Sequence, residues 1–343
     1  MIYDYPSKFV LKYKNFSIVW LFPNLDIVTN PSIRRRYKLH RFLLENCGIH
    51  SEIIVKKPGS LYDTGRTEEL FEYLEKFDVV VLFNVDEEDF LIAQRMHQEG
   101  KIALFDHCEA IFNLAHETPI MSAVAGITCS STALARSTEK FLEKNLKIDK
   151  PIFVIRDAVD EMVEKDLNRI WSLRQERFKS DFNVAVSMGI SVGYVTNFLI
   201  EVCAEAGYEL IIISSPEYGI PAQIVQWTPY TWIDDMMQND VALCCHLLDT
   251  FPDKSNIKIT AAMSLGMPVI ASPLEAYKEA VIDNYDGILV DNDKARWVEC
   301  LNRFKDKDLR RTFGCRAFQS SFNLYRQSIL GFDFLSAVSI LLK

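Results

Sequence analysis

The chain has 343 residues, of which 49% are hydrophobic and 25% charged, and this ordinary globular composition excludes a disordered, collagen-like or low-complexity protein. Its 38 basic and 47 acidic side chains give a formal net charge of −9, which opposes general attraction to nucleic acid or anionic lipid. The length predicts two domains, each with its own core.

Short apolar runs alternate with longer segments of helical period, which is typical of βαβ units and parallel sheets. In the first half, strands are predicted at 17–22, 51–55, 79–83, 102–105, 126–129 and 152–155, and helices at 32–46, 68–76, 87–99 and 133–144. After a charged helical linker at 161–179, strands are predicted at 183–187, 209–214, 241–246 and 268–271, and helices at 195–206, 231–238, 257–265 and 276–283. We therefore expect two doubly wound α/β halves of similar size.

The eight cysteines contain no C-x2-C pair and lie mostly in apolar runs, so we expect reduced core thiols rather than zinc ligands or disulfides. The first residues carry no apolar leader, and no run of eighteen uncharged apolar residues occurs. These features predict a cytoplasmic protein, with peripheral contact at the inner face of an anionic membrane as an open alternative.

The segment 253–272 (DKSNIKITAAMSLGMPVIAS) combines a polar loop, a helix, a glycine stop and a short buried strand. Ser255 or Asn256 is predicted to cap the helix, whose free N–H groups would favour an anion at the carboxyl edge of the sheet. Lys254 and Lys258 stand near one helix face, from which both would reach a diphosphate.

Together with 279–282 (EAVI), 286–290 (DGILV) and 308–310 (DLR), this segment resembles the nucleotide-sugar glycosyltransferases of the two-Rossmann-domain (GT-B) fold, especially the mostly retaining, family 4-like group with an E-x7-E motif. The resemblance implies two doubly wound Rossmann-like domains facing across a cleft. The expected boundaries are an acceptor domain at 1–160, a donor domain at 161–320, and a last helix within 321–343 that packs back on the first domain.

The resemblance also implies that a nucleotide-diphosphate sugar binds the second domain. The residues expected to hold this donor are Ser191, Asp253, Lys254, Ser255, Asn256, Lys258, Glu275 and Tyr277. At the two glutamate positions of the E-x7-E motif the chain has Asp253 and Ala261. The family's Arg and Lys that hold the diphosphate are absent from 187–194, where glycines and backbone N–H groups remain.

Polar residues at the end of a predicted buried strand are the catalytic candidates: His107, Asp106 and Glu109. The histidine resembles the family's residue near the reacting sugar, and either carboxylate would position or deprotonate an acceptor hydroxyl.

The acceptor is expected near Asn24, Arg34, Arg35 and Arg36. Three positive charges at a helix start oppose its dipole unless an acceptor phosphate or an anionic membrane offsets them, and the alternative is a solvated cationic turn. The acids at 86–89 are predicted to complement a helix dipole rather than to hold a metal.

The expected activity is transfer of a sugar to a hydroxyl of a carbohydrate or lipid-linked acceptor, in the assembly of a surface polysaccharide or glycoconjugate. Retention of anomeric configuration follows from the resemblance alone. No metal, further cofactor or nucleic-acid partner is expected, because helix dipoles and basic residues would stabilise the departing diphosphate. Two alternatives stay open: a non-catalytic homologue that serves as a partner or acceptor-recognition subunit, and a sugar-nucleotide epimerase or phosphorylase on the same fold.

Overall fold

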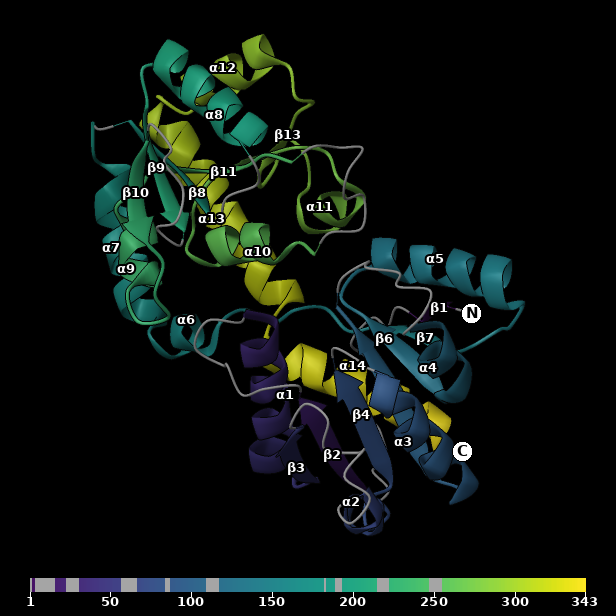
Figure 1. Cartoon of the computed structure of the whole chain (residues 1–343). Helices are drawn as coiled ribbons and strands as arrows, with labels where there is room; N and C mark the ends of the chain where they lie inside the picture. Colours follow the sequence, from purple (N-terminus) through teal and green to yellow (C-terminus); the bar gives the residue numbers. More distant parts are fainter. Residues whose placement is uncertain are drawn as a thin grey trace. The chain divides into compact units, whose positions relative to one another are not determined.

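The protein consists of two compact units (Figure 1). Unit 1 comprises Met1–Ala158 and Gln327–Lys343, and unit 2 comprises Val159–Arg326, so the chain passes between the units twice. The computed structural model describes residues 2–3, 16–22, 31–56, 67–83, 87–108, 117–181, 183–188, 193–214, 222–246 and 255–343.

Unit 1 is built on a seven-stranded sheet in the order β1-β7-β6-β5-β4-β2-β3, and its strands pair in parallel. The strands are β1 (Ile2–Tyr3), β2 (Ser17–Phe22), β3 (His50–Val55), β4 (Val79–Phe83), β5 (Ile102–His107), β6 (Gly126–Cys129) and β7 (Ile152–Val154). The central strand β4 is buried along its whole length, which explains its uninterrupted run of apolar residues.

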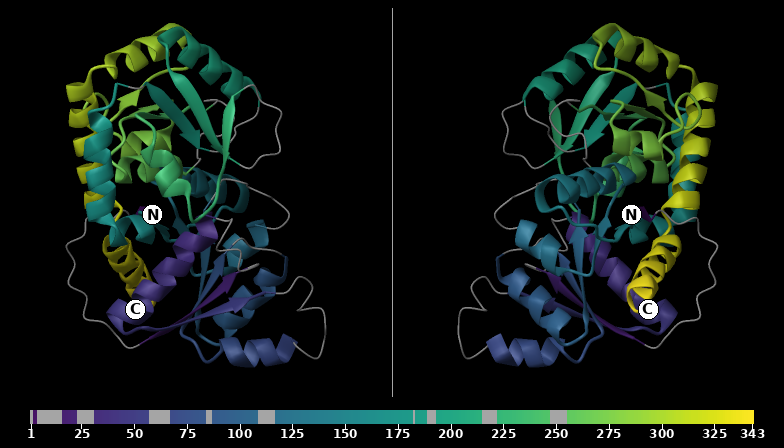
Figure 2. Two further views of the ribbon diagram at one scale, coloured as in Figure 1. Left: turned by 90° about the vertical axis from the view of Figure 1, so that its left-hand side faces the viewer. Right: turned by 90° about the vertical axis from the view of Figure 1, so that its right-hand side faces the viewer.

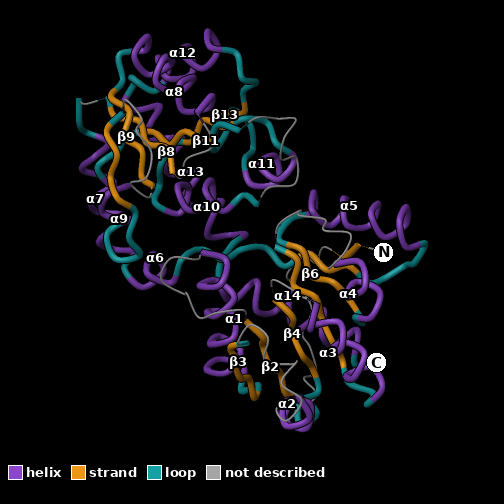
Figure 3. Tube along the Cα trace, viewed as in Figure 1, coloured by secondary structure: helices purple, strands orange, loops and turns teal. Residues whose placement is uncertain are grey.

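Helices cover both faces of this sheet (Figure 3). Alternate strand residues point to opposite faces, so Trp20 packs with α1 (Pro31–Cys47) and α14 (Gln327–Leu341), whereas Leu21 packs on the other side. The helices of that other side are α2 (Thr67–Leu74), α3 (Glu87–Gln98), α4 (Glu117–Ala123) and α5 (Thr132–Phe141), the last continuing into a π-helical turn, η1 (Leu142–Leu146).

The last helix, α14, lies beside α1, as Figure 2 shows. The ring of Phe334 stacks on Trp20 of β2 with centroids 5.0 Å apart. The two helices approach closely because Gly331 has no side chain, and a Cβ there would lie 2.2 Å from the ring of Phe42. The expected return of the last helix to the first half of the chain is therefore confirmed.

Unit 2 is built on a six-stranded parallel sheet in the order β10-β9-β8-β11-β12-β13. The strands are β8 (Val184–Met188), β9 (Glu209–Ser214), β10 (Gln223–Gln226), β11 (Val241–Cys244), β12 (Val269–Ala271) and β13 (Ile288–Leu289). The helices are α6 (Glu161–Lys165), α7 (Leu167–Phe178), α8 (Gly193–Ala206), α9 (Trp232–Met237), α10 (Ile257–Ser264), α11 (Glu275–Ala280), α12 (Lys294–Arg303) and α13 (Lys307–Leu324).

The two faces of the second sheet also bury separate cores. Residues of α8 and α12 pack on one face, and residues of α7, α9 and α10 pack on the other. Helix α13 contributes Phe313 to the first core and Phe322 to the second. The order of strands therefore places α8 and α10 on opposite faces after two neighbouring strands, β8 and β11.

Such a reversal of strand order opens a crevice outside the carboxyl ends of the two strands, where open α/β sheets bind their ligands. In unit 2 the reversal lies between β8 and β11, because its strands follow the order 3-2-1-4-5-6. In unit 1, leaving out β1, the order is 2-1-3-4-5-6, and the reversal lies between β2 and β4. Each unit thus has one edge at which a ligand site is expected.

Candidate functional site

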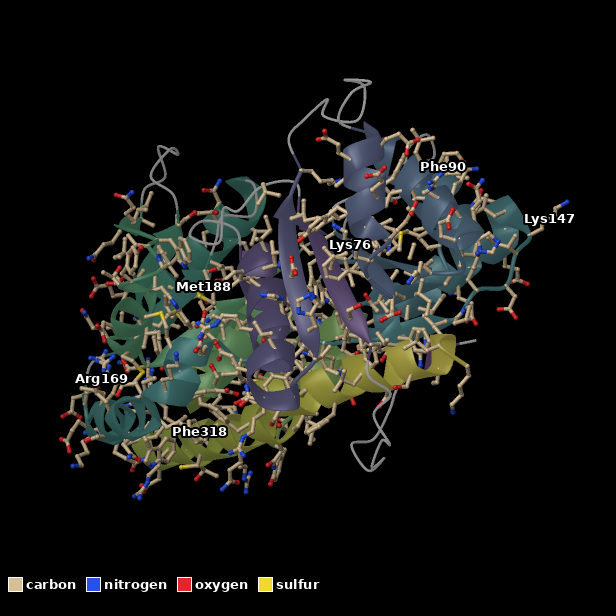
Figure 4. All side chains as sticks on the ribbon, turned by 90° about the horizontal axis from the view of Figure 1, so that it is seen from below. Lys76, Phe90, Lys147, Arg169, Met188 and Phe318 are labelled. Carbon is tan, nitrogen blue, oxygen red and sulfur yellow. The ribbon has the colours of Figure 1, made fainter. Side chains whose placement is uncertain are left out.

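A ring of hydrogen bonds fixes the chain where it leaves β11 in unit 2. The Ser272 hydroxyl accepts from the His246 N–H at 2.9 Å and donates to Asn292 Oδ1 at 2.7 Å. The Asn292 amide donates in turn to the His246 carbonyl at 2.6 Å. Met188, labelled in Figure 4, ends the neighbouring strand β8 at the same edge. The geometry of this edge is therefore set by neutral polar groups.

Helix α10 starts at this edge, and the side chain of its N-cap residue does not cap it. Asn256 occupies the N-cap position, where its carbonyl accepts from the Thr260 N–H at 3.0 Å, but its amide makes no capping bond. The amide instead donates to the Ala276 carbonyl at 3.3 Å and to the Tyr325 hydroxyl at 3.2 Å. Of the two residues predicted to cap the helix, Asn256 therefore does not do so through its side chain. The N–H groups of the first turn keep their attraction for an anion.

Two fully buried polar atoms near this edge have no hydrogen-bond partner among the described residues. They are Asn256 Oδ1 and the Tyr277 hydroxyl, on residues whose exposed fraction is 0%. The Tyr277 ring meets the His246 ring edge-on, with centroids 5.7 Å apart. Burial raises the pKa of Tyr277 well above its ordinary value, so the phenol stays neutral and keeps a proton to donate.

Lys258 supplies a positive charge in the first turn of α10, and its side chain is half-buried. Burial raises the pKa of the Cys244 thiol at the end of β11 to about 12, and the Lys258 charge offsets part of that rise. The positive charge of Lys258 is therefore close enough to the end of β11 to affect Cys244. A cation and the N–H groups of one helix start are suited to a diphosphate.

Of the remaining predicted donor ligands, Ser255 is half-buried directly before α10, and Glu275 is exposed at the start of α11. The Glu275 carboxylate pairs with Lys278 at 2.7 Å on the surface of that helix. Three predicted donor ligands of unit 2 and one catalytic candidate of unit 1 lie outside the described residues: Ser191, Asp253 and Lys254, and Glu109. The roles of all these residues stay predictions.

In unit 1, Arg36 is buried and already occupied by neighbouring groups. Its Nε donates to Asp106 at 2.6 Å, one Nη donates to the Ile155 carbonyl at 3.3 Å, and the other lies 3.6 Å from Asp157 Oδ1. Burial alone would lower the pKa of Arg36, but the charge of Asp106 and further neighbours outweighs burial and raises it. Arg36 is therefore the centre of an internal charge cluster rather than a solvated cationic turn.

The side chains of the other predicted acceptor residues lie outside the described part of the structure. Asn24 lies outside the described residues, and Arg34 and Arg35 lie in α1 with side chains outside the described part. An acceptor phosphate or an anionic membrane was one expected counter-charge for this turn. At Arg36 the negative charge comes instead from aspartates of the same unit.

Asp106 and His107 end β5 with their side chains on opposite faces of the sheet, because successive strand residues alternate. The Asp106 carboxylate accepts from Arg36 and from the Thr128 hydroxyl at 2.7 Å. His107 turns toward α5, where its Nδ1 lies 3.2 Å from the Thr138 hydroxyl, and its ring stacks on Phe105. Both residues are only 2% exposed. The strand therefore brings the two candidates to one edge but not to one pocket.

A second buried ion pair at this edge joins Lys56, directly after β3, to Asp89 in the first turn of α3, with 2.5 Å between Nζ and Oδ2. Asp89 is 0% exposed, so it is more than an acid that complements a helix dipole. Sequence reasoning missed this pair, as well as His246 and Asn292, because each depends on partners far along the chain.

A hollow of about 580 Å³ lies elsewhere on unit 1, lined by residues of α3 and α4, such as Phe90 and Gln94, by the segment before β6, and by Lys150 before β7. Lys150 donates there to the Val124 carbonyl at 2.6 Å. The hollow lies near the amino ends of β5 and β6, away from the edge expected to bind ligands.

Within the described ranges, no three His, Cys, Asp or Glu side chains form a group that could hold a metal ion. No helix of the described part of the chain is long and apolar enough to cross a membrane.

Comparison with known proteins gives matches in structure but not in sequence. No family model matches the sequence, and no curated protein matches it. The fold is similar to a glycosyltransferase from Rickettsia africae (TM-score 0.70, 14% identity, 96% of this chain and 100% of that chain). It is also similar to HepE from Anabaena in complex with UDP (0.68, 13%, 94% and 99%). A third similar structure is the UDP-GlcNAc 2-epimerase from Neisseria meningitidis bound to UDP-GlcNAc (0.51, 13%, 90% and 98%). The expected two-Rossmann, GT-B fold class is thereby confirmed.

Proposed function

We propose that the protein is a glycosyltransferase that takes a sugar from a nucleotide-diphosphate donor bound to unit 2. The observation that carries the proposal is the start of α10 at the strand-order reversal, where Asn256 makes no side-chain cap, Lys258 lies in the first turn, and Asn256 Oδ1 is buried without a partner among the described residues. The fold similarity supports it, because HepE was solved with UDP and with UDP-glucose.

In this proposal different groups at the edge of unit 2 bind different parts of the nucleotide-sugar donor. The N–H groups of α10 and the Lys258 ammonium offset the negative charge of the diphosphate, and that charge grows as the sugar–phosphate bond breaks. Asn256 and Tyr277 contribute neutral hydrogen bonds. Asp253, Lys254, Ser255, Ser191 and Glu275 complete the proposed donor set.

Unit 1 is proposed to bind the acceptor, a carbohydrate or lipid-linked hydroxyl of surface-polysaccharide or glycoconjugate assembly. The Asp106 carboxylate accepts hydrogen bonds from Arg36 and Thr128, so in this proposal it positions the groups of this edge rather than contacting the acceptor. His107 and Glu109 stay the proposed residues nearest the reaction. A retaining course, metal independence and a cytoplasmic place beside the membrane belong to the same proposal.

A second candidate function is sugar-nucleotide epimerisation, which the similarity to UDP-GlcNAc 2-epimerase favours. A third, a non-catalytic partner subunit, is favoured by Ala261 at the position of the family's second glutamate. Sugar nucleotide isomerised without an acceptor would indicate the epimerase.

Titration calorimetry with UDP, GDP, TDP, UDP-glucose and UDP-GlcNAc tests the donor site. We expect binding of one nucleotide, weakened about tenfold or more in Lys258→Ala because a charge-assisted hydrogen bond is lost. Lys294→Ala is the matched control, since Lys294 of α12 pairs on the surface with Glu201 and Glu205 of α8, and it should change the dissociation constant less than about twofold. Absence of binding to every probe would reject the transferase and the epimerase together.

A further inference from the structure

The Asn256 amide is oriented by two acceptors that use both of its protons. The Ala276 carbonyl can only accept, so the amide nitrogen must face it, and the second N–H goes to the Tyr325 hydroxyl. The oxygen is then left on the other side of the group. It is buried, and no donor from the described residues reaches it.

Tyr325 stands at the C-cap of α13, where the chain is about to leave unit 2, and it is 1% exposed. Its carbonyl accepts from the N–H of Val159, the first residue of unit 2, at 2.7 Å. The residue that orients Asn256 through its hydroxyl therefore also ties together the two segments by which the chain enters and leaves the unit.

A buried amide oxygen without a donor costs free energy, and a ligand that brings a donor recovers it. A diphosphate oxygen cannot do so, because it is an acceptor like the amide oxygen. A neutral hydroxyl can. The charged end of a donor therefore fits the N–H groups of α10 and Lys258, whereas Asn256 Oδ1 fits a hydroxyl of the ribose or of the sugar.

We propose that Tyr325 is a positioning residue of the donor site: its hydroxyl holds the Asn256 amide so that Oδ1 accepts a hydrogen bond from a hydroxyl of the nucleotide sugar. The proposal rests on the proposed function. It assigns a role in donor recognition to a residue 69 positions away from Asn256, at the point where the chain crosses between the units.

The test measures dissociation constants of UDP-glucose, UDP and 2′,3′-dideoxyuridine diphosphate for the wild type and two variants of the full chain. Tyr325→Phe removes only the hydroxyl, and Asn256→Ala removes the oxygen itself. Tyr208→Phe is the control, because the Tyr208 hydroxyl makes a buried bond to the Leu301 carbonyl at 3.0 Å in the same unit. We expect both variants to bind UDP-glucose about tenfold more weakly, while the control stays within about twofold.

The three probes separate positioning from a general loss of structure. A contact to the ribose weakens UDP and UDP-glucose together, a contact to the sugar weakens UDP-glucose alone, and in both cases the dideoxy probe changes less than about twofold. Equal weakening of all three probes, or none, would overturn the role of Tyr325 while leaving the donor site standing. A wild type that binds none of the probes would overturn the donor site and this role with it.

Discussion

The two units present different chemistry at corresponding edges of similar sheets. At the carboxyl edge of unit 1, the described charged groups neutralise one another in two buried sets, Arg36 with Asp106 and Asp157, and Lys56 with Asp89. At the carboxyl edge of unit 2, the fully buried polar groups of the described residues are neutral, and two of them, on Asn256 and Tyr277, lack hydrogen-bond partners within the described part of the chain.

The difference follows from what burial costs each kind of group. A buried ion is so unfavourable that it must be paired within the fold, so the ionic edge of unit 1 completes itself. An amide or phenol oxygen left unpaired costs far less, so unit 2 can hold such atoms ready for a ligand. We infer that unit 1 uses its charges to set its shape, and that unit 2 keeps hydrogen-bonding capacity for the donor.

The most severe way to break this comparison is to remove the cation of unit 1. Arg36→Ala leaves Asp106 and Asp157 buried without their counter-ion, and we expect a loss of about 3–5 kcal/mol in the free energy of unfolding. Urea denaturation followed by circular dichroism measures it.

Arg41→Ala is the matched control, because the Arg41–Glu45 pair lies on the same helix with side chains 41% and 53% exposed. It should cost less than about 1 kcal/mol. Equal effects of the two substitutions would contradict the view that the Arg36 cluster organises unit 1.

Adding UDP should sharpen the comparison, because a ligand of unit 2 stabilises only the unit that binds it. At a hundred times its dissociation constant, UDP should raise the stability of unit 2 by about 2.7 kcal/mol. Hydrogen exchange of β11 and β4 reports the two units separately. Slower exchange in β4 alone would place the nucleotide on the wrong unit.

Glycine contacts give a smaller, matched pair of tests. A Cβ at Gly314 on α13 would lie 2.3 Å from the Gly266 carbonyl, whereas one at Gly331 on α14 would meet the ring of Phe42. A half-buried ring can rotate but a backbone carbonyl cannot, so Gly314→Ala should destabilise unit 2 by about 1–3 kcal/mol and Gly331→Ala should destabilise unit 1 by less. Thermal melts of both variants would reveal a reversed order.

Most of the fold is predictable from the sequence because local patterns carry it. Apolar runs such as 79–83 and glycines such as Gly100 and Gly266, which adopt a positive φ after helices, mark the strands and helix ends. Short elements carry too little pattern, and no prediction covered β13, with two residues, or the half-buried β10.

The order of strands in unit 1 could not be predicted from the sequence either, because it depends on which strands pair rather than on which segments form strands.

The candidate site was predictable only in part. The segment around α10 was found by its motif, but the partners that determine its chemistry are distant: Asn256 bonds Tyr325 across 69 positions, and Arg36 meets Asp106 across 70. Local reasoning sees Asn256 as a helix cap and three arginines as a cationic turn. Long-range contacts instead show that Asn256 bonds to Tyr325 and that Arg36 pairs with Asp106.

The smallest effect concerns pH and the ionic character of unit 1. Burial lowers the pKa of His40, which lies 2.8 Å from the Ser51 hydroxyl beside Trp20. The neutral ring is therefore favoured in the folded protein, and its contribution is present above the ordinary histidine pKa and is lost as the pH falls below it. Between pH 7.5 and 5.5, the melting temperature of the wild type should fall further than that of His40→Gln, which cannot take up a proton.

The difference between the two proteins isolates His40, because every other titrating group is common to both and cancels. His50→Gln is the control, since His50 is exposed on β3 and pairs with Glu52. This substitution removes an exposed imidazole, so the loss of melting temperature on acidification should stay close to that of the wild type. If the melting temperature of His40→Gln falls as much as that of the wild type, the folded protein has no preference for the neutral form of His40. The charge balance of unit 1 would then depend on its ion pairs alone.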